Sequence, residues 1–233
     1  MAGYSQGGMA QAGPITEDLS GTTTITGGLL WESHYVSEGR DNLNDTGIQT
    51  TTLDVNLGKF NLSLWNGWGY DSGYDELQIS PSMEFEAGDF DVYFMFNHKR
   101  FFEEGQSENE IGSGISTNNL PYNMFINLDW YYLFENDGSF YLVSTGTHLN
   151  PVKNLTLEPT IELGFNDNYI TDGHDGANHA SLQLNGEYEL PGQLKIYSYI
   201  RYNIAIESEP GIYPGDESLR NFFWGGIGLE IEF

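Results

Sequence analysis

The stretch that decides the fold is the last one, "WGGIGLEIEF" at residues 224–233. Apolar side chains stand at Ile227, Leu229, Ile231 and Phe233, and glycine or glutamate stands between them. Strict alternation predicts a β-strand with one apolar and one polar face. A soluble domain seldom ends such a strand on an exposed phenyl ring, so the surroundings of the apolar face become the main question.

The same alternation runs through most of the 233 residues, and helical periodicity is nearly absent. Gly, Pro, Asn and Asp punctuate it as turn signals. The segment near 109–118, "NEIGSGISTN", has few apolar residues and is the weakest of the predicted strands. Twelve strands are predicted, near 22–35, 47–57, 60–70, 76–87, 90–102, 109–118, 121–134, 139–149, 155–166, 178–190, 193–206 and 221–233.

The connections between these strands alternate in length. Short turns are predicted at 58–59, 88–89, 119–120, 150–154 and 191–192, and longer loops near 36–46, 71–75, 103–108, 167–177 and 207–220. The short connection at 135–138 breaks the pattern. Short turns at one end and long loops at the other are typical of an outer-membrane barrel. We therefore expect an all-β fold, a transmembrane antiparallel up-and-down β-barrel of about 12 strands, over residues 22–233.

Alternation alone does not separate this barrel from a soluble, lectin-like sandwich, which would hide its apolar face inside. The apolar face of the predicted strands carries no Asp, Glu, Lys or Arg. Aromatic residues gather near strand ends, as the interfacial girdles of membrane barrels do. The pattern favours the membrane barrel, with the sandwich as the alternative; the girdle residues are Trp31, Trp68, Tyr132, Phe134 and Phe233.

The polar face defines the candidate functional residues. It holds twelve acidic and three basic side chains, a formal imbalance of −9 from 12 minus 3. Carboxylate pairs such as Glu84/Glu86 resemble glycosidase pairs, but they recur on unrelated strands and fit a solvated lumen wall. Lumen-side aromatics could stack on sugar rings or fill a small barrel, and filling is the preferred interpretation. The predicted pore-lining residues are Asp54, Glu84, Glu86, Asp91, Lys99, Asp129, Glu158, Glu162, Glu187, Lys195 and Arg201.

Composition limits the partners. The net charge is −26 and there is no cysteine, so nucleic acid would be repelled and thiolate metal sites are excluded. No apolar stretch reaches the length of a transmembrane helix, and the start "MAGYSQGGMAQAG" lacks the pattern of a signal peptide. Residues 1–21 are expected to form a flexible leader.

The C-terminal strand resembles the terminal signal that the barrel assembly machinery recognises in bacterial outer-membrane proteins. A narrower resemblance rests on "WESHYVSEGR" (31–40), "GKFNLSLW" (58–65), "GDFDVYF" (88–94), "FYLVSTGTHL" (140–149), "LGFNDNY" (163–169) and "NHASLQL" (178–184). Together with "WGGIGLEIEF", these segments resemble the TorF-type porins of Gram-negative bacteria. The resemblance implies a single-chain barrel with passive transport, and it supplies no catalytic residues.

Enzyme and metal signals are weak. None of the five histidines has metalloprotease spacing, and no G-x-S-x-G motif occurs. We expect no catalytic residue, metal or cofactor, although His34 and Glu32 leave a hydrolase as a distant alternative and the loop "NDNYITDGHDGAN" (166–178) offers oxygen ligands for calcium. The predicted function is an outer-membrane channel for small polar solutes that prefers cations. The other alternative is a non-conducting surface-binding or structural barrel.

Overall fold

The computed structural model describes residues 23–233, and the predicted leader 1–21 lies outside this range. The barrel wall consists of β1 (Thr23–Glu32), β4 (Ile48–Leu57), β5 (Phe60–Gly69), β6 (Asp75–Ala87), β7 (Phe90–Phe101), β8 (Gln106–Thr117), β9 (Met124–Leu133), β10 (Gly138–Thr147), β12 (Leu155–Asp167), β13 (Gly176–Leu190), β14 (Leu194–Ala205) and β15 (Phe222–Glu232). Shorter elements are β2 (Val36–Ser37), β3 (Arg40–Asp41), β11 (Leu149–Val152) and the 3-10 turns η1 (Pro121–Asn123) and η2 (Pro214–Glu217).

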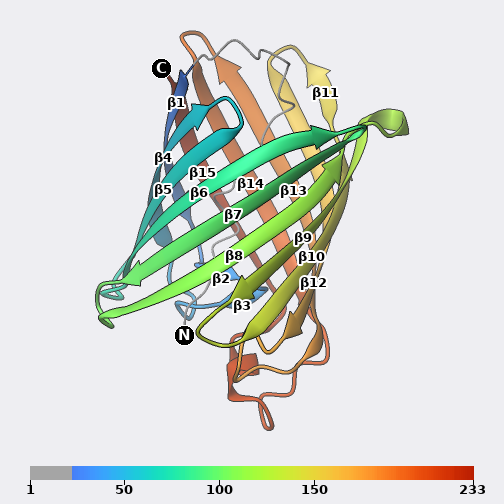
Figure 1. The fold of residues 1–233 in the computed structure, drawn as a ribbon. Helices are drawn as coiled ribbons and strands as arrows, with labels where there is room; N and C mark the ends of the chain where they lie inside the picture. The colour runs from blue at the N-terminus through green and yellow to red at the C-terminus, as the bar shows by residue number, and fades with distance from the viewer. Residues whose placement is uncertain (1–22) are drawn as a thin grey trace.

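The wall is a closed antiparallel barrel (Figure 1). Each wall strand pairs with its neighbours in the sequence, and β1 pairs with β15 to close the ring, with Leu29 opposite Leu229. Within residues 23–233 this gives the twelve strands that the sequence predicts, and the observed boundaries lie within a few residues of the predicted ones.

The weak segment near 109–118 is a full strand, β8, which pairs with both β7 and β9. The glycines of β8 are explained by the close packing of aromatic rings from the neighbouring strands. A Cβ on Gly112 would come within 2.9 Å of the Tyr131 ring, and one on Gly114 within 2.3 Å of the Tyr93 ring. The aromatic rings of the two neighbouring strands therefore cover the space that larger side chains of β8 would need.

Pro81 and Pro159 each lack a backbone N–H inside a wall strand, and from the sequence a β-bulge is the expected way to accommodate them. The structure shows no bulge at either position. The register of β6 against β7 is the same on both sides of Pro81, with Ile79 opposite His98 and Ser82 opposite Met95. Pro159 lies opposite Leu184 in unbroken register with β13. Each proline is accommodated without an inserted residue.

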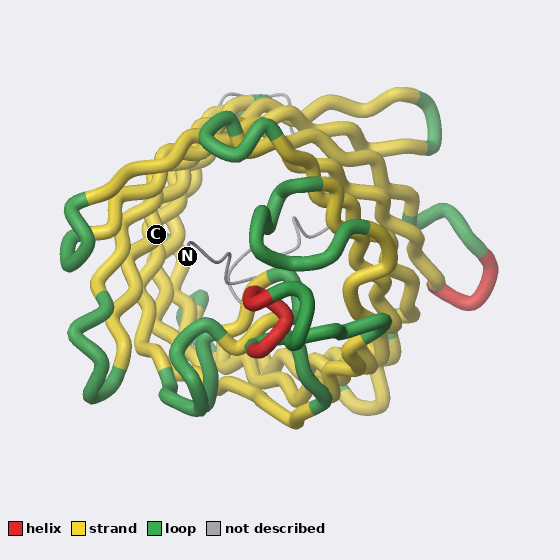
Figure 2. Tube along the Cα trace, turned by 90° about the horizontal axis from the view of Figure 1, so that it is seen from below, coloured by secondary structure: helices red, strands yellow, loops and turns green. Residues whose placement is uncertain are grey.

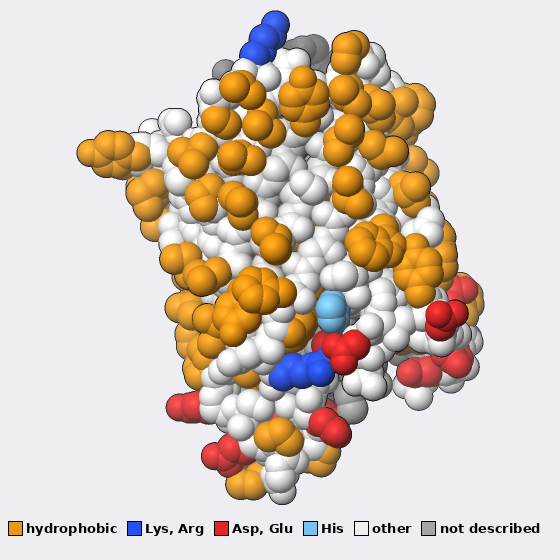
Figure 3. All heavy atoms as spheres, turned by 180° about the vertical axis from the view of Figure 1, so that it is seen from behind, with side chains coloured by type: hydrophobic (Ala, Val, Ile, Leu, Met, Phe, Trp, Pro, Cys, Tyr) orange, Lys and Arg blue, Asp and Glu red, His pale blue; other side chains and the backbone are white. Residues whose placement is uncertain are grey.

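The outer surface of the barrel is apolar. Phe94 is 51% exposed and Ile200 is 54% exposed, and in Figure 3 hydrophobic side chains cover the wall while acidic ones gather towards one end. An exposed apolar surface of this extent suits hydrocarbon rather than water. Among residues 23–233, no helix is long and apolar enough to cross a membrane.

The two ends of the barrel differ. One end has the short turns after β4, β6, β8, β10 and β13. The last residue lies at the same end, beside the start of β1, where the Phe233 N–H donates to the Ile25 carbonyl at 2.8 Å. We call this the turn end. The other end, called the loop end, holds the long connections, of which 33–47 and 206–221 are the longest within the described chain.

Candidate functional site

The connection between β1 and β4 enters the barrel lumen. Val36 pairs with Asp41 and Ser37 with Arg40 in a small hairpin, and every residue from 35 to 41 is buried. Figure 1 labels β2 and β3, and Figure 2, seen from the loop end, shows parts of the loops inside the ring of strands. We call residues 36–41 the lumen hairpin. The sequence indicates only a long loop here, because docking inside a barrel leaves no periodic signal.

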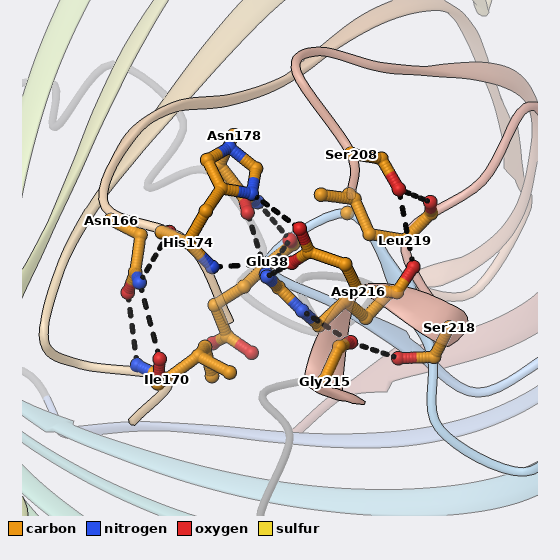
Figure 4. Close-up of polar contacts among 12 residues, drawn as sticks. Glu38, Asn166, Ile170, His174, Asn178, Ser208, Gly215, Asp216, Ser218 and Leu219 are labelled. Carbon is orange, nitrogen blue, oxygen red and sulfur yellow. Dashed lines mark hydrogen bonds and ion pairs between the residues drawn. The ribbon is translucent and has the colours of Figure 1, made fainter. Parts of the chain in front are cut away.

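Arg40 holds the lumen hairpin to two other segments, and its partners Asn178, Gly215 and Asp216 are labelled in Figure 4. Its Nη2 donates to Asp216 Oδ1 at 3.0 Å, its Nη1 to Asn178 Oδ1 at 2.6 Å, and its Nε to the Gly215 carbonyl at 3.2 Å. The side chains of Arg40 and Asp216 are 2% and 0% exposed. A buried ion pair requires such additional hydrogen bonds to offset the loss of hydration.

Asp216 is kept ionised by its neighbours. Burial alone would raise its pKa, but the N–H groups of Glu209 and His174 and the His174 imidazole, whose Nδ1 lies 2.7 Å from Asp216 Oδ2, bring the pKa below its ordinary value. His174 Nε2 lies 2.9 Å from the Ala177 carbonyl, which fixes the ring. Asp216 is therefore a permanent counter-ion for Arg40 at neutral pH.

A β-bulge aims Asn178 at the hairpin. The register of β12 against β13 shifts between Gly164 and Phe165, which lie opposite His179 and Ala177, so Asn178 is the inserted residue. Bulges re-aim side chains in this way. Asn178 Nδ2 donates to the Glu38 carbonyl, and the side chain is fully buried.

Gly39 seats the hairpin tip against the wall. Its φ is +72°, and a Cβ there would come within 2.4 Å of the His179 ring. Both the left-handed backbone and the close approach require glycine. The Gly39 carbonyl accepts a hydrogen bond from Asn203 Nδ2 at 2.8 Å, so the tip is tied to β14 as well as β13.

A second buried network lies on the wall strands β6, β7 and β8. Glu76 accepts hydrogen bonds from Tyr74 and from Tyr35, the latter at 2.7 Å. Lys99 Nζ lies 3.5 Å from Glu110 Oε2 and donates to Tyr169 at 3.3 Å. Neither Glu76 nor Glu110 is among the predicted lining residues, although strand parity places Glu76 on the polar face with Gln78.

Glu38 lies in the hairpin, outside the spanning strands. Burial raises its pKa to about 7, against the opposing influence of Lys99, Ser37 and Arg40, while Glu110 adds to the rise. Within the hairpin, the Glu38 carboxyl therefore changes its protonation state near neutral pH.

The predicted lining residues fall into two groups. Towards the turn end, Lys195 Nζ lies 3.6 Å from Glu187 and 3.5 Å from Glu230, and His148 lies 3.1 Å from Glu158. Asp54, Glu84 and Asp129 are half-buried, and Glu86 and Asp91 are exposed. Asp129 accepts a hydrogen bond from Tyr93 at 2.8 Å.

Towards the loop end the remaining predicted residues are packed under the hairpin. Lys99 and Arg201 are buried, and Glu162 lies 3.4 Å from the His179 ring. The Arg201 guanidinium lies over the Trp224 ring at 5.0 Å and the Tyr199 ring at 5.3 Å. Val36–Gly39, Glu162, His179, Arg201 and Trp224 enclose a cavity of only about 10 Å³, enough for one water. The lumen hairpin therefore packs closely against this part of the lumen wall.

The predicted girdle residues lie near the strand ends. Trp31 is 45% exposed, Phe134 50% and Phe233 70%, whereas Trp68 and Tyr132 are half-buried. Phe233 is at the turn end and the other four are at the loop end.

The structure does not bring together the residues of the two alternative sites, the His34/Glu32 hydrolase site and the calcium loop 166–178. Glu32 is buried under Tyr199, whose hydroxyl donates to it, whereas His34 contacts Ser33 and Asp45. Within residues 23–233, the three aspartates of the loop 166–178 do not form a common group of metal ligands. Asp175 instead accepts a hydrogen bond from the Asn168 N–H at 2.7 Å.

The comparisons with known proteins support the fold. No family model matches the chain, and no curated protein matches it. Among solved structures, a KdgM porin aligns with a TM-score of 0.62 at 11% identity, over 89% of this chain and 99% of that one. An outer membrane channel from Pseudomonas putida F1 aligns with a TM-score of 0.60 at 8% identity, over 95% and 99%. A NanC porin aligns at 0.56 and 11% identity, over 90% and 99%.

These similarities show the fold, a closed antiparallel β-barrel of the kind found in those outer-membrane porins and channels. Identities near 10% show the fold and do not transfer a solute or an activity. The solved neighbours are porins and channels, but none of them is shown to be TorF-type, so that narrower resemblance stays an expectation from the sequence.

Proposed function

We propose that the protein is a porin-like channel of the bacterial outer membrane, through which small polar solutes diffuse passively and cations are preferred. The observation that carries this proposal is a charged, carboxylate-rich lumen inside a barrel with an apolar outer belt. The lipid bilayer is then the partner of the belt. The loop end, with the long loops and the lumen hairpin, would face the exterior of the cell, and the turn end would face the periplasm.

The cation preference rests on how the basic groups are used. Lys195 lies between two glutamates, Lys99 beside Glu110, and Arg40 on Asp216. These pairs neutralise the basic groups locally and leave the acidic excess of the lumen in place. Low-dielectric walls focus such a field, and rings of acidic groups favour cations. One similar structure is of a KdgM porin in complex with oligogalacturonate, an acidic sugar chain, for which this negative lumen would be poorly suited.

Assembly would use the last strand. Phe223, Ile227, Leu229, Ile231 and Phe233 are all exposed on the outer face of β15. A terminal strand with this alternation is what the barrel assembly machinery would recognise, and small polar solutes or cations would be the partners of the finished pore.

A non-conducting surface-binding or structural barrel is the second candidate, because the buried lumen hairpin occupies part of the lumen. Reconstitution in planar lipid bilayers separates the two. The channel proposal expects discrete conductance steps in potassium chloride. A folded barrel that inserts but stays silent, even after the lumen hairpin is released, would favour the second candidate. The hydrolase alternative is not supported, because Glu32 and His34 contact different residues.

Conductance is expected to rise with pH because of Glu38. A released hairpin would ionise Glu38 near its ordinary pKa of 4.5, whereas the docked hairpin keeps the proton up to about pH 7. The proton-linked stabilisation of the docked hairpin is therefore complete below pH 4.5 and is lost as the pH rises through 7. The difference in free energy is at most about 3 kcal/mol. Wild-type conductance should be higher at pH 8 than at pH 5.

The matched variant is Glu38→Gln, which keeps the shape of the side chain and cannot ionise. Its conductance should stay near the low-pH level of the wild type across this range. Equal pH dependence in the two proteins would show that other carboxylates control the effect.

A further inference from the structure

The stem of the lumen hairpin carries a group of possible metal ligands. One nitrogen of His34 and one carboxylate oxygen each of Asp41 and Asp45 lie within 4.8 Å of one another. His34 comes just before β2, and Asp41 is the last residue of β3. The three side chains thus lie where the hairpin leaves and rejoins the loop end of the barrel, away from the residues proposed to line the pore.

The geometry is close to that of a bound ion. His34 Nε2 lies 3.4 Å from Asp45 Oδ1. Two ligands of a tetrahedral zinc site, with bonds of about 2.0–2.2 Å, are about 3.3–3.5 Å apart. His34 Nδ1 lies 3.0 Å from Ser33 Oγ. In a metal-bound form, the tautomer with its proton on Nδ1 would donate to Ser33 Oγ and leave the lone pair of Nε2 for the ion, with Ser33 as the outer-sphere partner.

Asp41 gives the independent indication of a missing ligand. Its side chain is 0% exposed, and its Oδ1 is buried without a hydrogen-bond partner in the described chain. Only Oδ2 is used, by Arg220 and by the Asp45 N–H at 2.7 Å. A buried carboxylate oxygen without a partner costs free energy, so this atom is available to a further cation.

A cation already occupies part of this position. Arg220 Nη2 lies 2.6 Å from both Asp41 Oδ2 and Asp45 Oδ1. Its side chain is 39% exposed and its guanidinium lies over the Phe222 ring at 5.7 Å, so it can turn towards solvent. Asp45 is 61% exposed on a loop and can follow a smaller ion inward. With neutral His34, the group keeps a formal charge of −1 even beside Arg220.

We propose that His34, Asp41 and Asp45 bind a divalent transition-metal ion of the Zn²⁺ type in exchange for the Arg220 guanidinium. An imidazole nitrogen with two carboxylates suits such an ion better than Ca²⁺ or Mg²⁺, which take oxygen ligands. All three ligands belong to the connection between β1 and β4, so the ion ties the two sides of the hairpin stem together. Bound metal would release Arg220 and so remove one of the ties to the connection 206–221, while Arg40 would keep its contacts with Gly215 and Asp216.

The test is calorimetric titration of the folded barrel in detergent with zinc chloride alone. One site is expected. His34→Ala and Asp45→Asn should each weaken binding at least tenfold, and neither residue is needed for the barrel wall. Arg220→Gln should strengthen binding several-fold, because it removes the built-in competitor. This gain is the distinctive sign, since a purely structural ion pair would not produce it.

The matched control is His98→Ala. His98 is another half-buried histidine, on β7, and its Nδ1 lies 3.0 Å from Asn109 Oδ1 on β8. The zinc affinity of this variant should equal that of the wild type. The proposal is overturned if the wild type binds no zinc, if His34→Ala binds like His98→Ala, or if Arg220→Gln binds no more tightly than the wild type.

Discussion

Replacing Arg40 by methionine is expected to destabilise the docked lumen hairpin by about 3–5 kcal/mol, because removing one partner of a buried ion pair leaves the other charge uncompensated. The charge left behind is Asp216, whose side chain is fully buried. The hydrogen bonds of Arg40 to Asn178 and Gly215 are lost at the same time. The hairpin should leave the wall, and single-channel conductance should increase several-fold.

A suitable control is Arg100→Met. Arg100 bonds Ser107 and the Gly105 carbonyl near the loop end, and its removal changes the net charge equally. Its conductance should remain that of the wild type. An Arg40→Met protein that folds normally and conducts like the wild type would show that the hairpin does not restrict the pore.

Arginine on the outer face is the second large effect. Phe94→Arg or Leu184→Arg should block assembly or lower the free energy of unfolding by about 2–4 kcal/mol, since each places a charge towards hydrocarbon. Phe94 is 51% exposed and Leu184 is 44% exposed on the barrel wall. The measurement is unfolding in lipid, with the shift in gel migration on heating as a check of folding.

Neighbouring positions on β13 serve as controls, because adjacent residues of a strand face opposite sides. Gln183→Arg and Asn185→Arg should be tolerated, and Asn185 already lies 3.0 Å from the carboxylate of Glu158. The opposite ranking would mean that the apolar face is internal, as in a soluble sandwich.

The strands and their faces are predictable because their signal is local. Alternation within about ten residues fixes which side chains share a face, and turn residues fix where a strand ends. Even the weak strand near 109–118 is found, because its neighbours on both sides need a partner. The two prolines mislead, since a strand can skip one hydrogen bond without inserting a residue.

The lumen hairpin is not predictable in this way. Its main anchor joins Arg40 to Asp216, 176 positions later in the chain, and no periodic pattern connects them. A usable hint is the apolar residue Val36, which opens the predicted loop 36–46 directly after Tyr35. The contact of Asn178 with the hairpin is not predictable from the sequence either. It depends on the bulge in β13, and the bulge is set by the register between β12 and β13.

The measurement that tests the central claim most directly is the reversal potential across a planar bilayer under a potassium chloride gradient. The account predicts a potential of the sign that marks potassium as the more permeant ion, smaller at high salt because of screening. Neutralising Glu84, Glu162, Glu187 and Asp129 as Gln or Asn should reduce it. Neutralising four exposed loop carboxylates, Asp71, Glu103, Glu104 and Glu207, should change it much less. A chloride preference, or an unchanged potential after the lumen carboxylates are neutralised, would contradict the account.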